Sequence, residues 1–215
     1  RNNKQMKFVC ISDTHNTETE LPEVDVLIHA GDLTRRGSIS EVADAAKWLE
    51  SLDFAIKIVI AGNHDFLFET EPELARKLLK IHAPSVDYLQ DSFYQINGLK
   101  IYGSPWQPRF FNWAFNLTRG EEISKKWKRI PMDTDILITH GPPSQILDYA
   151  NFSGRHVGCE DLRFAIRELQ IKYHIFGHIH EGAGQQVVDD TTYINASVLD
   201  ERYAPIKGDI ITFEI

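Results

Sequence analysis

The sequence predicts a mixed α/β fold, and three observations support this prediction. First, apolar runs of four or five residues recur along the chain, as expected for strands that are buried on both faces of a sheet. Second, segments with helical spacing lie between some of these runs. Third, loops rich in Asp, His and Asn follow the runs, at the strand ends where open α/β sheets usually bind ligands. The runs are residues 8–11, 26–30, 56–60, 136–139 and 173–176.

Three helices are expected in addition to these strands. Ser38 and Glu41 fit a capping box, in which each side chain accepts a hydrogen bond from the backbone of the other residue. Apolar residues at helical spacing follow them. A second helix is expected over residues 70–78. A third would open at Glu160 and Asp161, because acidic residues in a first turn suit the helix dipole.

Two stretches are typical of antiparallel strands. Residues 93–96 and 99–102 flank Asn97 and Gly98, and an Asn-Gly pair accepts the positive φ angles of a tight hairpin turn. Three more strands are expected near the end of the chain, at residues 187–188, 192–195 and 210–213.

The chain has 215 residues, of which 42% are hydrophobic, and this suits one globular domain with a substantial core. We therefore expect a single domain over residues 1–215, with the polar residues 1–5 disordered. No secretory leader is evident, although the chain starts at Arg1 rather than Met, so an upstream segment is not excluded.

Charge and composition narrow the classes of function. The net charge of −8 argues against a general binder of nucleic-acid polymers or membrane surfaces, because phosphate groups attract basic surfaces. No apolar run approaches the ~20 residues that cross a bilayer. The two cysteines, Cys10 and Cys159, make no disulfide framework, which favours a reducing compartment. We accordingly expect a cytoplasmic protein.

The loops after the first two strands carry short polar motifs. Asp13 and His15 lie two residues apart, and a turning loop would let both bind one divalent metal ion. Asp32 follows Gly31 after the second strand. Taken alone, each motif is equally compatible with a solvated loop, because Gly-Asp is a common turn pair.

Three later strands end in more specific motifs. A turn alone does not explain an amide oxygen next to an imidazole, or two histidines one residue apart, directly after a buried strand. Nitrogen ligands for zinc, iron or manganese are the leading interpretation, and ordinary loop histidines are the alternative. The motifs are Gly62-Asn63-His64-Asp65, His140-Gly141 and Gly177-His178-Ile179-His180.

The distribution of histidines supports the metal interpretation. Of nine histidines, five lie in these loops, namely His15, His64, His140, His178 and His180. The others have ordinary explanations. His29 lies within a strand and is expected to be a satisfied core residue, His82 lies near a helix end, and His174 begins a strand. His156 could face the cleft.

In this order along the chain, from residue 13 to residue 180, the motifs resemble the calcineurin-like metallophosphoesterase family. A closer resemblance is to the metallophosphoesterase-domain-containing subgroup, first described as brain and fetal-brain proteins, which act on phosphodiesters like the class III cyclic-nucleotide phosphodiesterases. The segments that carry it are Gly103-Ser104-Pro105-Trp106, Trp113-Ala114-Phe115-Asn116, Thr139-His140-Gly141-Pro142-Pro143, His180-Glu181-Gly182 and Tyr193-Ile194-Asn195-Ala196-Ser197. The resemblance implies a four-layer α-β-β-α sandwich with two mixed β-sheets.

The resemblance also implies a site for two divalent transition metal ions, which would be manganese, iron or zinc. Asp13, His15 and His180 would hold the first ion, Asn63, His140 and His178 the second, and Asp32 would bridge them. With two carboxylates and otherwise neutral ligands, such a site would keep a charge of about +2 and would attract a phosphate even in an acidic protein. The mixed oxygen and nitrogen donors do not choose between the metals.

The implied reaction is hydrolysis of small phosphodiesters, with cyclic nucleotides as the best guess, by attack of a hydroxide that bridges the metals. His64 is not a ligand in the family. It would lie beside the phosphate and protonate the leaving oxygen. No covalent phospho-enzyme is required.

One segment departs from the family pattern. In many relatives, the position of Arg35 holds an acidic residue, and this residue orients the histidine that corresponds to His64. Arg35 takes that place here, so the orienting group must come from elsewhere. Arg36 matches a phosphate-binding arginine of phosphoprotein phosphatases, and a solvated arginine is the alternative.

The substrate would be a small phosphodiester or nucleotide rather than a nucleic-acid polymer. Trp106 belongs to an aromatic stretch, residues 105–115, which lacks any regular period and could stack a nucleobase, with core packing as the alternative. The loop over residues 142–158 should form another wall. The candidate substrate contacts are Arg36, Asn63, His64, Trp106 and Glu181.

Two alternative functions stay open at this point. A phosphomonoesterase or phosphoprotein phosphatase is the enzyme alternative, although no second arginine clamp for a dianion is evident. A non-catalytic scaffold on the same fold is the alternative of another class, and such a protein should have lost ligand residues.

Overall fold

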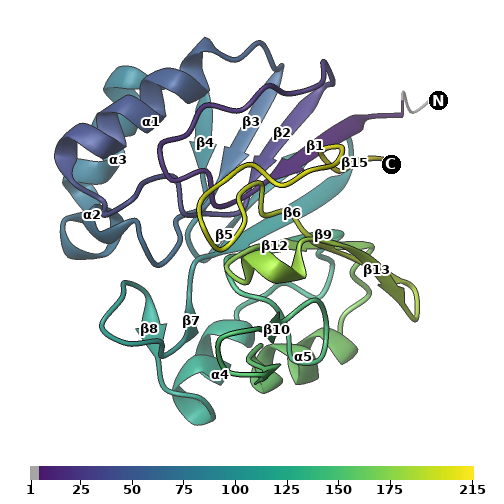
Figure 1. Cartoon of the computed structure of the whole chain (residues 1–215). Coiled ribbons are helices and arrows are strands. Elements are labelled where there is room, and N and C mark those ends of the chain that lie inside the picture. Colours follow the sequence, from purple (N-terminus) through teal and green to yellow (C-terminus); the bar gives the residue numbers. More distant parts are fainter. Residues whose placement is uncertain (1–4) are drawn as a thin grey trace.

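The computed structural model describes residues 5–215, which form four layers in the order α-β-β-α (Figure 1). One sheet has five strands in the order β15-β1-β2-β3-β4, and the other has six in the order β13-β14-β12-β9-β6-β5. This confirms the expected four-layer fold with two mixed sheets. The prediction of disorder for residues 1–5 concerns mainly residues 1–4, and these lie outside the described residues.

In the five-stranded sheet, four strands run parallel and the C-terminal strand pairs antiparallel with the first. That C-terminal strand was expected at residues 210–213, and it begins two residues later, at Thr212. The strands are β1 (Lys7–Ile11), β2 (Val26–His29), β3 (Ile56–Val59), β4 (Val86–Tyr88) and β15 (Thr212–Glu214).

In the six-stranded sheet, four parallel strands lie between two antiparallel edge strands. The Asn97-Gly98 turn joins β5 to β6 as expected. The strands are β5 (Ser92–Ile96), β6 (Leu99–Ser104), β9 (Ile136–Thr139), β12 (Tyr173–Phe176), β13 (Gly184–Val188) and β14 (Thr191–Asn195).

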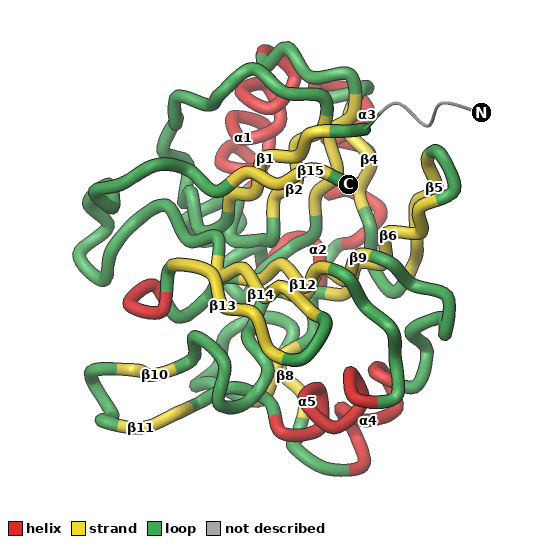
Figure 2. Tube along the Cα trace, turned by 90° about the vertical axis from the view of Figure 1, so that its right-hand side faces the viewer, coloured by secondary structure: helices red, strands yellow, loops and turns green. Residues whose placement is uncertain are grey.

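Two small sheets lie outside the sandwich and were not expected from the sequence. The first pairs β7 (Gln107–Pro108) with β8 (Asn116–Leu117). The second pairs β10 (Tyr149–Ala150) with β11 (Arg155–His156), and this hairpin projects from the body of the molecule (Figure 2).

The capping box predicted at Ser38 and Glu41 is present at the start of the first helix. The helix expected over residues 70–78 is present, but it begins at Pro72 and extends to His82, and a separate short helix ends at Thr70. Pro72 is the first residue of a new helix, and a proline disfavours helical backbone in the residue before it. The helices are α1 (Ile39–Ser51), α2 (Phe66–Thr70), α3 (Pro72–His82), α4 (Glu121–Trp127), α5 (Glu160–Arg167) and the 3₁₀ helix η1 (His180–Gly182).

Alternating residues of the strands feed three apolar clusters, one between each pair of layers. Val9 and Ile11 face the helices α1 to α3, whereas Phe8 and Cys10 face the second sheet. Beyond the second sheet, Phe176 packs in the cluster that includes α4 and α5 side chains. Both faces of each sheet are thus covered, which explains the continuous apolar runs in the sequence.

The loops at the carboxyl ends of the parallel strands of both sheets meet one another. Within the first sheet, the amide of Asp13 donates to the carbonyl of Gly31 over 2.9 Å. Within the second, the amide of Gly177 donates to the carbonyl of His140 over 2.8 Å. Between the two sheets, the amide of His178 donates to Oδ2 of Asp13 over 3.0 Å, so the polar motifs of both sheets lie together. Within residues 5–215, none of the helices combines the length and apolar character required to cross a membrane.

Candidate metal centre

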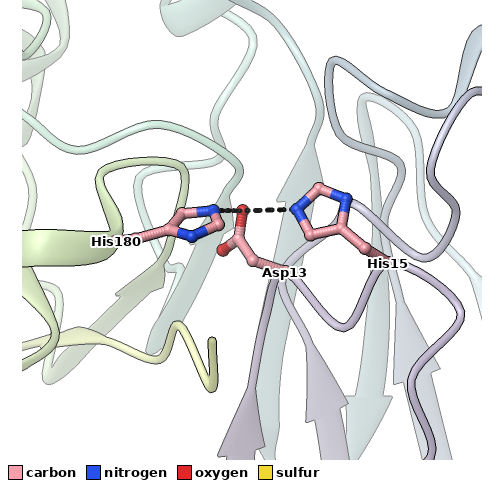
Figure 3. A group of neighbouring side chains, drawn as sticks. All are labelled: Asp13, His15 and His180. Carbon is pink, nitrogen blue, oxygen red and sulfur yellow. Dashed lines mark ion pairs between the residues drawn. The ribbon is translucent and has the colours of Figure 1, made fainter. Parts of the chain in front are cut away.

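The loop after β1 places Asp13 between two imidazoles. Nε2 of His180 lies 3.3 Å from Oδ1 of Asp13, and Nε2 of His15 lies 4.0 Å from the same oxygen. Figure 3 shows the two rings on opposite sides of the carboxylate. The other oxygen, Oδ2, accepts hydrogen bonds from the amide of His178 over 3.0 Å and from the hydroxyl of Ser197 over 2.9 Å. Asp13 is therefore fixed on one side and open to a cation on the other.

Asp32 is the residue that joins the parts of the site. Its Oδ1 accepts a hydrogen bond from the amide of His64 over 2.8 Å. Its Oδ2 lies 3.4 Å from Nε2 of His140, 3.6 Å from Nε2 of His15 and 4.0 Å from Nε2 of His64. One carboxylate oxygen thus faces ligand-type nitrogens from three different loops.

Asn63 makes the corresponding contact on the far side of Asp32. Its side-chain oxygen lies 2.8 Å from Nε2 of His140 and 2.9 Å from Nδ1 of His178. The structure therefore brings together all seven side chains that were predicted as ligands. Asp13 approaches His15 and His180, Asn63 approaches His140 and His178, and Asp32 approaches one histidine of each set.

Several of these residues adopt the left-handed backbone region that side chains other than glycine rarely occupy. The φ angles are 58° at Asp13, 46° at His15, 56° at Asp32 and 69° at His178. Such conformations cost on the order of 1–3 kcal/mol each and cluster at functional sites. Here they turn each side chain back toward the meeting point of the loops, immediately after a strand.

The donor set fits metal ions, because the histidines present unshared electron pairs to the carboxylates. Nδ1 of His15, His140 and His180 each lies 2.8–3.0 Å from a backbone carbonyl, which can only accept, so this nitrogen carries the proton. In a neutral imidazole, Nε2 then faces a carboxylate oxygen, acceptor against acceptor. Among the described residues, buried Nε2 of His15 has no hydrogen-bond partner. A cation between these atoms resolves the conflict, and carbonyl-anchored histidines are typical of metal sites.

The electrostatics of the site also favour a bound cation. Burial opposes the charged form of His140, but the Asp32 and Asp13 carboxylates outweigh burial and raise its pKa to about 9. Burial likewise opposes charge on His180, and Asp13 raises the pKa of that imidazole to about 9. Without a metal, protons would occupy these nitrogens. A metal ion would have to displace those protons, so the site competes for cations of either kind.

Two glycines make room for the carboxylates. A Cβ atom at Gly62 would collide with Oδ1 of Asp32, and one at Gly177 would collide with Oδ2 of Asp13. Only glycine allows the backbone to approach a carboxylate this closely. These positions account for the glycines that precede Asn63 and His178 in the sequence motifs.

A backbone carbonyl takes the place of the acid that the sequence lacks at Arg35. Nδ1 of His64 lies 2.6 Å from the carbonyl oxygen of Arg35. That carbonyl is fixed in turn, because the Arg35 side chain donates to the carbonyl of His15 and its amide donates to Asn16. The indole of Trp113 stacks on the imidazole at 4.0 Å between ring centroids. His64 is thus oriented from two sides without a carboxylate.

Asp65 is buried and joins two loops of the site, a role that the sequence analysis did not predict. Its carboxylate accepts hydrogen bonds from the amides of Gly62, Leu33 and Thr34 and from the Thr34 hydroxyl, at 2.7–3.1 Å. Burial, together with the nearby charge of Asp32, raises the pKa of Asp65 to about 6. These bonds tie the loop after β2 to the loop after β3. The position of Asp65 at the end of the Gly62 motif was the available signal.

The predicted substrate contacts divide into two sets. A cavity of about 530 Å³ opens onto Asp32, Asn63 and His64, and Glu181 also lines it. Arg36 does not line the cavity. Its side chain is exposed, and its amide donates to Glu41, so its position does not support the predicted phosphate contact.

Trp106 also lies away from the cavity, which corrects the expectation that it stacks on substrate. Its indole N–H donates to Asp91 over 2.9 Å, its ring packs edge-on against Phe115, and the Lys126 ammonium lies 4.1 Å from the ring centroid. The core-packing alternative for this residue holds. Other aromatic residues of the same stretch, Phe110 and Phe111, line the cavity instead.

Several histidines outside the site have the structural roles expected of them. His29 is buried and lies 2.8 Å from the hydroxyl of Thr14. His174 is buried and lies 2.8 Å from the hydroxyl of Thr139. His156, which could have faced the cleft, does not line the cavity, and it lies 2.5 Å from the buried carboxylate of Asp148 in the loop that follows β9.

This fold, with carboxylates, imidazoles and an amide meeting at the strand ends, defines a metal-dependent phosphoester hydrolase. Residues 6–182 match the family model described as calcineurin-like phosphoesterase, and the chain belongs to that family. Human metallophosphoesterase domain-containing protein 1 is 44% identical over 229 residues, covering 95% of this chain and 70% of the human protein. UPF0046 protein T07D4.2 of Caenorhabditis elegans is 38% identical over 239 residues, covering 98% of this chain and 60% of the worm protein.

Solved structures show the same fold at much lower identity. One crystal structure superposes with a TM-score of 0.70 at 16% identity, covering 89% of this chain and 90% of the other. The structure of TT1561 from Thermus thermophilus superposes with a TM-score of 0.59 at 12% identity, covering 89% of each chain. At such identities the likeness concerns the fold alone.

Proposed function

We propose that this protein is a two-metal phosphodiesterase that hydrolyses small phosphodiesters, with cyclic nucleotides as the leading candidates. The observation that carries the proposal is the position of Asp32, whose Oδ2 faces His15 of one group and His140 of the other. A carboxylate shared between two donor groups suits two ions held close together. Asp13, His15 and His180 would hold one ion, Asn63, His140 and His178 the other, and Asp32 both.

The residues divide the chemistry among them. When bound, the ions would supply Lewis acidity toward phosphoryl oxygens and would lower the pKa of water enough to provide hydroxide near neutral pH. Manganese, iron and zinc all suit the donors. Asn63 and His64 border the cavity beside Asp32, where a phosphoryl group would bind. The strained backbone at four of the predicted ligands and the carbonyl groups that bind the imidazoles hold the side chains of the site in place before substrate binds. This reduces reorganisation during the reaction.

In this proposal, His64 would transfer one proton, at Nε2. Because the Arg35 carbonyl accepts from Nδ1, that nitrogen keeps its hydrogen in either protonation state. Nε2 lies 4.0 Å from Oδ2 of Asp32 and is therefore directed at the centre of the site. In the protonated imidazole, this nitrogen would give its proton to the leaving oxygen of the ester.

The cationic side chains around the cavity bear on the choice between a diester and a monoester. A monoester dianion calls for additional cationic side chains, and the arginine expected to supply one, Arg36, does not line the cavity. Arg119 lines it, but its guanidinium donates to the carbonyls of Val157 and Gly158 and pairs with Glu160. Arg36 and Arg119 therefore provide no ready clamp for a dianion. Arg109 and Arg155 also line the cavity, and they are the arginines that a monoester would have to use.

The proposal is tested by a screen of cyclic mononucleotides, cyclic dinucleotides and linear diesters with added manganese, with product identity as the readout. We expect hydrolysis of at least one diester, and faster turnover of bis-p-nitrophenyl phosphate than of p-nitrophenyl phosphate. Faster turnover of the monoester would support a phosphatase instead. Absence of bound transition metal together with absence of turnover would support a non-catalytic scaffold.

Metal content tests the number of ions independently of turnover. We expect two equivalents per chain by elemental analysis after dialysis against manganese or zinc. A plateau at one equivalent would contradict the dinuclear proposal.

We further propose a reducing compartment such as the cytoplasm, which is supported by two cysteines that are both buried and unpaired.

A further inference from the structure

We propose that Phe110, Phe111 and Phe152 form a subsite for a planar aromatic group of the substrate. We call these three residues the phenylalanine wall. The inference deepens the proposed function and rests on it, because the wall would select among phosphoesters by the ring they carry. All three side chains line the cavity that contains Asp32 and His64.

The wall is continuous with the candidate metal centre. The ring of Phe110 meets the imidazole of His178 edge-on, at 5.6 Å between centroids and an interplanar angle of 87°. Phe111 packs against Phe110 at 4.7 Å, and Phe152 approaches Phe110 at 6.0 Å. A group bound on these rings would therefore lie next to a phosphoryl group held at His178.

The wall exposes an unusual amount of apolar surface. The residues Phe111 and Phe152 are each 72% exposed, although they come from separate loops, one between β7 and β8 and the other between β10 and β11. Clustered exposed apolar side chains usually mark a binding site, because apolar surface in contact with water costs free energy that a bound ligand removes. Neighbouring rings with a concave cavity behind them suit a flat ring better than an alkyl chain.

Asn116 holds the first part of the wall in an unfavourable conformation. Its side-chain oxygen accepts from the amide of Phe110 over 3.1 Å, and its side-chain nitrogen donates to the carbonyl of Phe111 over 2.9 Å. Phe111 has a φ of 47°, in the left-handed region that bulky residues rarely adopt. The clamp therefore maintains a strained backbone that presents the ring to the cavity, which a purely structural turn would not require.

A second clamp holds Phe152. The amide of Asn151 donates to Oε1 of Glu181 over 2.6 Å, and its side-chain nitrogen donates to Oε1 of Glu201 over 2.7 Å. Glu181 directly follows His180, so the position of Phe152 is tied to the metal centre. Glu181, which we expected to contact substrate, is thereby assigned a positioning role for the wall.

The occupant that fits this combination is a phosphoester with a nucleobase-like or aryl ring. The cavity of about 530 Å³ lies within the range of nucleotide-sized ligand sites. Stacking of one base on aromatic side chains changes affinity by about tenfold or more, and it tolerates different bases. The wall would therefore select for the presence of a ring rather than for one base.

The test compares two product-type ligands that share a phosphate and a ribose. Binding of adenosine 5′-monophosphate and of ribose 5-phosphate to the manganese-loaded protein is measured by isothermal titration calorimetry. We expect the wild-type protein to bind the nucleotide about tenfold or more tightly than ribose 5-phosphate. Phe111→Ala and Phe152→Ala should reduce that ratio to about threefold or less, while the affinity for ribose 5-phosphate stays unchanged.

Two further variants separate the wall from general effects. Phe164→Ala removes an equally exposed phenylalanine, 68% exposed on α5 and outside the cavity, and should leave the ratio at its wild-type value. Asn116→Ala keeps all three rings but removes the clamp, and should lower the ratio as the Phe111 variant does.

The outcomes distinguish this inference from the proposed function. Equal affinities of the two ligands in the wild-type protein, or an unchanged ratio in both Phe111→Ala and Phe152→Ala, would overturn the subsite even if diesters are hydrolysed. A ratio that depends on these residues would support the subsite even if no diester in the screen is turned over, in which case the proposed function alone would fail.

Discussion

Asp32 is 1% exposed and faces three imidazoles, whereas Phe152 in the same cavity is 72% exposed and contacts one other ring of the wall. The predicted ligands are held by backbone carbonyls and by strained residues at the ends of sheet strands. The phenylalanine wall is held by two asparagines, Asn116 in the short strand β8 and Asn151 in the turn after β10. Charged groups tolerate burial only when every partner is in place. The wall can therefore change its residues at little cost to folding, whereas the metal centre cannot.

The largest effect is expected from the residue shared by both ligand groups. Asp32→Asn keeps the shape of the side chain but removes the negative charge that both ions would share. We expect a loss in kcat/KM on the order of a thousandfold, since metal ions contribute several kcal/mol and each 1.36 kcal/mol is tenfold. Metal content should fall below two equivalents by elemental analysis. The matched control is Asp44→Asn, on the exposed face of α1, which should retain activity and metal. Normal turnover in Asp32→Asn would contradict the role given to this carboxylate.

The next effect separates proton transfer from metal binding. His64→Ala should reduce kcat by about a hundredfold or more for esters with alkyl leaving groups, which need a proton. The loss should be much smaller for p-nitrophenyl esters, whose leaving group departs as an anion. Metal content should stay at the wild-type level. An equal loss with both kinds of leaving group would contradict proton donation by Nε2.

A smaller effect should follow from loosening Asp13 without altering it. Ser197→Ala removes the hydroxyl that donates to Oδ2 of Asp13 over 2.9 Å. Outer hydrogen bonds to metal ligands typically change metal affinity by about 10–100-fold. We expect about a tenfold weaker affinity for one of the two ions, measured by competition with a chelating dye. Ser197→Thr keeps the hydroxyl and should recover most of the affinity.

The last effect concerns the stability of the fold beneath the candidate metal centre rather than activity. Burial lowers the pKa of His174 to about 3, from a usual value near 6.5. Between these values the unfolded chain binds a proton at this residue and the folded chain does not. Folding stability should therefore fall as the pH decreases from about 6.5 toward 3, by up to about 1.4 kcal/mol per pH unit for this group.

His174→Gln removes that titration, so the variant should lose stability less steeply over the same pH range. Urea unfolding at a series of pH values, with a chelator present in all samples, provides the measurement. Parallel pH profiles for the variant and the wild-type protein would show that another group causes the acid sensitivity.

The sequence was most informative where the chemistry resides in side chains next to strand ends. Asp13, Asn63 and His178 could be predicted because short buried strands and their polar loops are local patterns. The orienting partner of His64 could not be predicted, because the carbonyl of Arg35 belongs to the backbone and leaves no trace in residue identity. Phe152 was missed because its approach to Phe110 depends on two loops that meet only in the folded chain.

The helix boundaries and the aromatic stretch show the same limit. Pro72 begins a helix rather than continuing one, and this could have been read from the sequence through the restriction that proline places on the preceding residue. Whether Trp106 or Phe111 would face the cavity depended on hydrogen bonds to Asp91 and Asn116. The sequence alone did not distinguish Trp106 from Phe111 as a residue that could stack on substrate.

The hydrogen bond between Ser197 and Asp13 spans 184 positions of the chain. Asp13 is synthesised before Ser197, and its carboxylate acquires this partner only after Ser197 has been added. His180 similarly receives its anchor from the carbonyl of Asp200. At about 5–20 residues per second, a ribosome takes on the order of ten seconds or more to make the intervening segment. In the proposed metal centre, binding of an ion at Asp13 and His180 would therefore follow synthesis of the chain through Asp200, and a nascent fragment that ends earlier would lack the geometry to retain an ion.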